Sequence, residues 1–170
     1  MLARQAGIAI ANARLLDRLQ RSEAEVRRSE ARFRYLVNAS PDVVWEIDLE
    51  GRFTFVSDAI ERMTGRPAAD VVERPMAEVI TPDTLPEAMD QLRRILLDPH
   101  GVVEARFALV HLDGHAVPVE NFATGVFHEG RLVGGHGSGR DLTERDRLEK
   151  DLGRQASELA SSAERAHLAR

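Results

Sequence analysis

The chain has 170 residues, a formal net charge of −5, 30% charged residues, 43% hydrophobic residues and no cysteine. This balance is typical of a globular protein and lacks the overall basic charge that favours nucleic-acid binding, so we expect no nucleic-acid partner. The lack of cysteine excludes disulfides, thiolate catalysis, cysteine-ligated zinc and cysteinyl–flavin photochemistry. No stretch approaches the roughly 18–20 apolar residues that span a membrane, so we expect a cytoplasmic protein without membrane contact in this segment.

Residues 2–37 predict one long helix, because they contain no proline and are rich in Ala, Leu, Arg, Glu and Gln. One seam of this helix repeats at alternating spacings of three and four residues, as in a coiled coil. The seam comprises Ala9, Asn12, Leu16, Leu19, Glu23, Val26, Glu30, Phe33 and Val37. Ile8, Leu15 and Leu19 form a competing stripe. We expect a parallel homodimer through this helix, and the alternative is a single amphipathic helix packed on its own domain.

A hairpin follows Pro41, which ends the helix. Its first strand alternates Val43, Trp45 and Ile47 with Val44, Glu46 and Asp48, so one face is expected to be buried. A turn at Gly51 leads to a second strand in which Phe53 and Phe55 alternate with Arg52 and Thr54.

Short helices are expected over residues 57–72, with Gly65 as a C-cap and Pro67 opening the second of them. Residues 84–97 predict an amphipathic helix, whose apolar residues are Leu85, Met89, Leu92, Ile95 and Leu96. Three strands are expected next, over residues 102–112, 117–127 and 132–139, separated by turns at Asp113-Gly114 and at residues 128–130. The last strand holds four glycines, which leave room for close approach of another backbone.

This order of two strands, several short helices and three strands predicts an α+β fold, with a five-stranded antiparallel sheet and helices on one face. A second long helix begins near residue 143, where Thr143 and Asp146 fit a capping box. Its seam again follows coiled-coil spacing. The seam comprises Leu152, Ala156, Leu159, Ala163 and Ala166. Because this helix reaches residue 170 without a terminator, we expect the chain to be part of a longer protein.

Two motifs resemble the PAS sensor family: SEARFRYLVNASPDVVWEIDLEGRFTFVSDAIERMTG at residues 29–65 and GRDLTER at residues 139–145. The resemblance covers residues 29–148, and it departs from the family at Ser57, where Asn is frequent. It implies three segments: a signalling helix (1–39) similar to the end of a GAF domain, a PAS domain (40–142) and an output helix (143–170). The final AERAHLAR is similar to the residues before the phosphoacceptor of one histidine-kinase class.

The resemblance implies a sensory or signal-relay module of a multidomain bacterial protein, a two-component sensor histidine kinase, with a covalently linked output domain. The chain itself is not expected to be an enzyme, because acidic pairs such as Glu46 and Asp48 lack an accompanying nucleophile or phosphate loop. Asp141 and Thr143 lie where the sheet meets the output helix, and they either couple the two or form an ordinary helix cap.

The predicted fold offers a candidate pocket for a small-molecule ligand between sheet and helices. The candidate lining residues are Val44, Trp45, Phe55, Ile60, Met63, Leu92, Phe107 and Val119. We expect no bound cofactor; the alternatives are a sensor for flavin, haem or an acyl chain, and a structural dimerisation module without ligand. Haem-binding PAS domains generally carry the proximal histidine on the helix that corresponds to residues 84–97, where this chain has none. No metal site is expected, since no set of His, Asp and Glu has ligand spacing.

Overall fold

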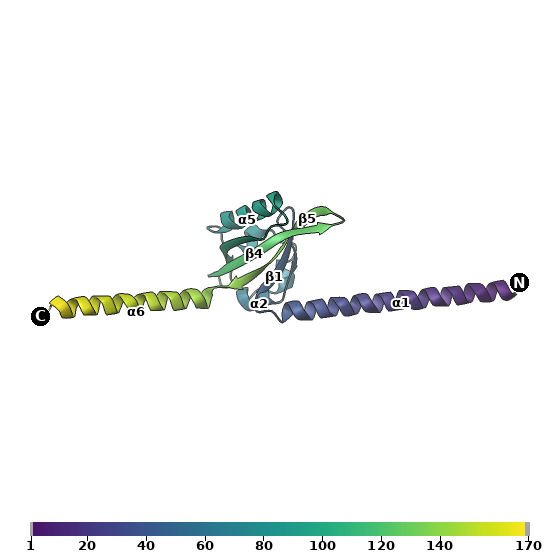
Figure 1. Ribbon diagram of the computed structural model, residues 1–170, viewed down its shortest axis with the longest axis horizontal. Coiled ribbons are helices and arrows are strands. Elements are labelled where there is room, and N and C mark those ends of the chain that lie inside the picture. The colour runs from purple at the N-terminus through teal and green to yellow at the C-terminus, as the bar shows by residue number, and fades with distance from the viewer. Residues whose placement is uncertain (1, 169–170) are drawn as a thin grey trace. The chain divides into compact units, whose positions relative to one another are not determined.

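The computed structural model describes the backbone of residues 2–168 and the side chains of residues 14–159. The chain divides into two compact units, residues 1–40 and residues 41–170. The first unit is helix α1 (Leu2–Asn38), and the second contains a five-stranded sheet, helices α2 to α5 and the long helix α6 (Thr143–Leu168), as Figure 1 shows. None of the helices within residues 2–168 combines the length and apolarity that crossing a membrane requires.

Helix α1 confirms the helix predicted before Pro41. Its last turn tightens, because the N–H of Ser40 donates to the carbonyl of Val37 at 3.2 Å. Four apolar side chains of the predicted seam are 54–61% exposed. They are Leu16, Leu19, Val26 and Phe33. The side chains of Ile8, Ala9 and Asn12 lie outside the described residues.

The sheet confirms the predicted five antiparallel strands, in the spatial order β2-β1-β5-β4-β3. The strands are β1 (Val43–Asp48), β2 (Phe53–Val56), β3 (Val103–Val110), β4 (Ala116–His128) and β5 (Arg131–Asp141). The last strand is thus central, between the first and the fourth. It leads directly into α6, so the exit helix continues from the middle of the sheet.

The short helices are α2 (Ala59–Thr64), α3 (Ala68–Val71), α4 (Met76–Val79) and α5 (Leu85–Leu97). Helix α5 packs against β3 and β4 through a face that includes Ala88, Leu92 and Ile95, each at most 6% exposed. Met89 and Leu96, which the sequence placed on the apolar face, are instead 50% and 42% exposed. Contact with the sheet determines which face of α5 is buried. The apolar stripe in the sequence is wider than this contact, so it does not show which of its residues are buried.

A β-bulge in β2 changes which of its residues face the core. Ile47 pairs with Phe53 and Glu46 pairs with Phe55, so Thr54 is the extra residue between them. Phe53 and Val56 are therefore both buried, whereas Phe55 lies opposite Glu46 and is only half-buried. The predicted simple alternation of Phe53 and Phe55 on one face is wrong, because the inserted residue reverses the pattern.

The glycines of β5 confirm the predicted close approach of another backbone. A Cβ atom at Gly134 would lie 1.9 Å from the carbonyl oxygen of Ile47, and one at Gly137 would lie 2.2 Å from that of Phe122. Neither position has room for a side chain, so these glycines allow β5 to lie between β1 and β4.

Candidate functional site

The interior of the second unit contains a small cavity of about 40 Å³ between the sheet and helices α2 to α5. Most of its walls are apolar, and two amide side chains, Gln91 and Asn121, also reach it. The volume is enough for about one water molecule, whereas sites for drug-sized ligands occupy roughly 300–1,000 Å³. The residues that the sequence offered as a pocket therefore largely fill the space themselves.

Six of the eight candidate residues lie around this cavity. They are Trp45, Ile60, Met63, Leu92, Phe107 and Val119. Val44 does not line the cavity, because neighbours in a strand point to opposite faces and Trp45 takes the inner one. Phe55 does not line it either, because the bulge in β2 puts Phe53 and Val56 on the inner face.

A buried polar pair joins two strands at the cavity wall. The indole N–H of Trp45 donates to the amide oxygen of Asn121 at 3.0 Å, and the chain separates the two residues by 76 positions. The Nδ2 atom of Asn121 is buried and has no hydrogen-bond partner among the described residues. An unpaired buried N–H costs about 1–3 kcal/mol, so this wall offers a donor for a water molecule or for a carbonyl group of a small ligand.

Gln91 completes this polar wall from helix α5. Its side-chain amide donates to the backbone carbonyl of Val103 at 2.8 Å and more weakly to that of Asn121 at 3.4 Å. Sequence reasoning missed both amides. A usable indication was present, because Asn121 alternates with Val117, Val119 and Ala123, all of which are buried.

The junction between sheet and exit helix is a second candidate site. The carboxylate of Asp141 accepts the N–H of Thr143 at 2.7 Å and so caps the first turn of α6. Leu142, between them, is 6% exposed, and its N–H donates to the carbonyl of Pro118 in β4 at 2.9 Å. The predicted capping box is wrong, because the N–H of Asp146 donates to the carbonyl of Leu142 at 2.8 Å and not to the hydroxyl of Thr143.

The family model of the PAS fold matches residues 31–142 of the chain. The chain belongs to the PAS family. This PAS domain extends from the last turns of α1 to Leu142, so the cavity and the Asp141 cap lie within or at the edge of the matched segment.

Solved structures with the same fold include PAS domains from several microorganisms. One from Colwellia psychrerythraea is 18% identical with a TM-score of 0.60, and the match covers 70% of this chain and 98% of that one. The PAS domain of an HTR-like protein from Haloarcula marismortui is 22% identical with a TM-score of 0.58, covering 72% and 98%. A sensory box histidine kinase/response regulator from Burkholderia thailandensis is 20% identical with a TM-score of 0.56, covering 76% and 98%. No curated protein matches the chain.

The cofactors considered for a PAS domain do not fit this interior as it is packed. A flavin or a haem needs several hundred Å³, against a cavity of about 40 Å³. Among the described residues, the lining side chains of the cavity include no histidine and no charged group. The site is suited to a water molecule or a very small polar molecule bound at Asn121.

Proposed function

We propose that this PAS domain is a sensory or signal-relay module of a two-component sensor histidine kinase, linked covalently to an output domain beyond α6. The chain itself would catalyse no reaction. The similarity in fold to a sensory box histidine kinase/response regulator supports this choice, as does the long helix that continues from the central strand of the sheet.

The observation that carries the proposal is the attachment of α6 to the sheet. The buried Leu142 donates its N–H to Pro118, whose neighbour Val119 lines the cavity and pairs with Asp141. A change in the cavity that moves Val119 would therefore move the strand that holds the start of α6. Such a relay requires two states that differ in free energy at this junction.

Dimerisation through the long helices would give the relay an output. In α1, Leu19, Val26 and Phe33 recur every seven residues and are more than half exposed. In α6, Leu148, Leu152 and Leu159 are 56%, 65% and 73% exposed. A second copy of the chain could bury each of these seams in a parallel coiled coil. The side chains of Ala163 and Ala166 in the predicted C-terminal seam lie outside the described residues.

The alternative is a structural dimerisation module that binds no ligand. The small volume of the cavity favours the structural module, and the unpaired amide N–H of Asn121 favours a ligand. Native mass spectrometry of the purified protein, with an absorbance scan of the same sample, separates the two. A bound molecule would identify a sensor of that molecule. An apo dimer would exclude a ligand sensor and leave the structural module or a relay whose input arrives through α1, which the variant below distinguishes.

The Asp141→Ala variant tests the relay. Because the chain contains no cysteine, one cysteine introduced in place of the exposed Lys150 can carry a spin label. If the Asp141 cap sets the position of α6, the label-to-label distance distribution in the dimer should change in Asp141→Ala. Loss of an N-cap costs about 0.5–2 kcal/mol, so the domain should stay folded.

Glu144→Ala is the matched control, because it removes an acidic side chain from the same first turn of α6 and leaves the cap in place. It should leave the distance distribution unchanged. Equal distributions in wild type and Asp141→Ala would contradict the relay. A monomer at all concentrations would contradict the dimer.

A further inference from the structure

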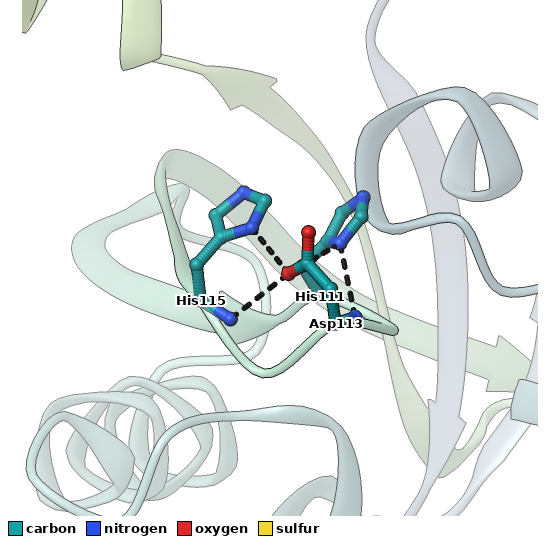
Figure 2. Close-up of side chains that lie close together, drawn as sticks. All are labelled: His111, Asp113 and His115. Carbon is teal, nitrogen blue, oxygen red and sulfur yellow. Dashed lines mark hydrogen bonds and ion pairs between the residues drawn. The ribbon is translucent and has the colours of Figure 1, made fainter.

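Three side chains with metal-binding atoms meet on the hairpin between β3 and β4. One carboxylate oxygen of Asp113 lies 2.9 Å from Nδ1 of His111 and 2.5 Å from Nδ1 of His115, as Figure 2 shows. The two imidazole rings stack with their centroids 4.2 Å apart. One ligand atom from each of the three residues lies within 4.8 Å of the others. The prediction that no set of residues has ligand spacing overlooked the pattern His-x-Asp-x-His at residues 111–115.

Backbone hydrogen bonds hold the three residues in this arrangement. The N–H of His111 donates to the carbonyl of His115 at 2.9 Å, which closes the hairpin. The N–H of His115 donates to the Asp113 carboxylate at 3.1 Å, and Gly114 turns the chain with a φ of +93°. The N–H of Leu112 donates to the carbonyl of Thr64 at 2.8 Å, so the hairpin is also fixed to the end of α2.

The orientation of His111 selects which nitrogen is available. Its Nε2 atom faces the end of α2, where a Cβ added at Gly65 would lie only 3.3 Å away. Its Nδ1 atom accepts the N–H of Asp113 at 3.2 Å and also faces the carboxylate oxygen at 2.9 Å. A nitrogen that accepts a hydrogen bond has its lone pair on that side, so the Nδ1 lone pair of His111 is directed at the turn that also holds the Asp113 carboxylate. A metal ion bound at Nδ1 would take this lone pair in place of the N–H of Asp113.

We propose that His111 and His115, through Nδ1, and Asp113, through its carboxylate, bind one divalent transition-metal ion, for which Zn²⁺ is the appropriate probe. Imidazole nitrogen and carboxylate oxygen together suit Zn²⁺ better than Mg²⁺ or Ca²⁺. Zn–N and Zn–O bonds of about 2.0–2.2 Å place tetrahedral ligands roughly 3.3 Å apart. The three side chains are 26%, 64% and 57% exposed, so small rotations can open the cluster to that spacing.

Three protein ligands leave one position of a tetrahedral ion open for water or for a group from another molecule. The site is separate from the cavity and from the α6 junction, so it does not depend on the relay proposed above. Because the hairpin is fixed to the end of α2, a bound ion would be held at a defined position on the domain.

Isothermal titration calorimetry of the whole chain with ZnCl₂ at neutral pH tests the site. We expect one Zn²⁺ per chain. Asp113→Asn and His115→Ala should each weaken Zn²⁺ binding by about tenfold or more. Even the loss of a hydrogen-bond partner of a metal ligand lowers metal affinity by about 10–100-fold. Asn preserves an oxygen that can accept the N–H of His115, so the turn is retained in that variant.

His128→Ala and His136→Ala are matched controls, because they remove histidines outside the cluster and should leave the affinity unchanged. Amide NMR spectra should show the Zn²⁺-induced shifts concentrated at residues 111–115. No binding to the wild type, unchanged binding in His115→Ala, or equal weakening by the control variants would overturn the proposal. Thermal midpoints of all variants check that a lost affinity is not lost folding.

Discussion

Leu142 and Pro118 form the one backbone hydrogen bond described between the start of the exit helix and strand β4, at 2.9 Å. Pro118 cannot donate a hydrogen bond to the sheet, but its carbonyl is available to Leu142. The side chain of Leu142 is buried at the same point. Helix α6 is thus attached to the sheet at Leu142, through its buried side chain and its backbone hydrogen bond.

Leu142→Ala should therefore destabilise the domain. Burial of a leucine side chain contributes about 2–5 kcal/mol relative to alanine, and we expect the lower part of this range because the site lies at the edge of the core. Urea unfolding measures the change. Leu148→Ala, at a position that is 56% exposed in the same helix, should change the free energy of unfolding of the monomeric domain by less than about 0.5 kcal/mol. Equal losses in the two variants would show that Leu142 is not an anchor.

Trp45 and Asn121 should show coupled stability. Trp45→Phe removes the indole donor and leaves the buried amide oxygen of Asn121 without it, so we expect a loss of about 1–3 kcal/mol. Asn121→Leu leaves the indole N–H unpaired in turn and should cost a similar amount. The double variant should lose less than the sum of the two, as measured by a double-mutant cycle. Strict additivity would mean that the hydrogen bond contributes nothing.

Two glycine substitutions should act in opposite directions. Gly134→Ala places a Cβ atom 1.9 Å from a backbone carbonyl of β1, so it should cost at least about 2 kcal/mol by overpacking. Gly153→Ala, in helix α6, meets no heavy atom within 4 Å, and it should stabilise that helix by about 1 kcal/mol. Thermal unfolding and far-ultraviolet circular dichroism measure both. A tolerated Gly134→Ala would contradict the close approach of β5 and β1.

Association should depend on the seam of α1. Replacing Leu16 and Leu19 together with glutamate should shift the protein towards monomer in sedimentation velocity, because charges in a coiled-coil core are costly. Arg14→Glu with Arg18→Glu is the control, since it changes two charges in the same turns away from the seam. A dimer that survives the leucine replacements would assign association to another surface.

The Asp113 carboxyl should titrate at unusually low pH in metal-free protein. Hydrogen bonds from the backbone N–H and then the imidazole of His115 lower its pKa from 3.8 to about 2. The folded-state pKa is depressed, so the contribution of this group to stability is fully present above pH 3.8 and is lost as the pH falls through 2. Carbon-detected NMR in EDTA should show this midpoint, and His115→Ala should raise it. A wild-type midpoint near 3.8 would contradict the hydrogen-bonded turn.

Local pattern and turn chemistry determined the elements of this protein from the sequence alone. The two-residue period of Val43, Trp45 and Ile47 established a strand with one buried face, and Gly65 and Gly114 marked reversals that require positive φ. The motifs at both ends of the domain resembled the PAS family, which the family match confirms. These features depend on residues that are neighbours along the chain, so the sequence predicts them without knowledge of the tertiary structure.

Tertiary structure alone decided how the faces meet. The bulge at Thr54 depends on pairing with β1, and it turned Phe55 away from the interior. Trp45 and Asn121 bond across 76 positions, and the volume left between sheet and helices depends on how all the lining side chains pack together. The spacing of His111, Asp113 and His115 was present in the sequence, but only the hairpin turn directs their ligand atoms to one point.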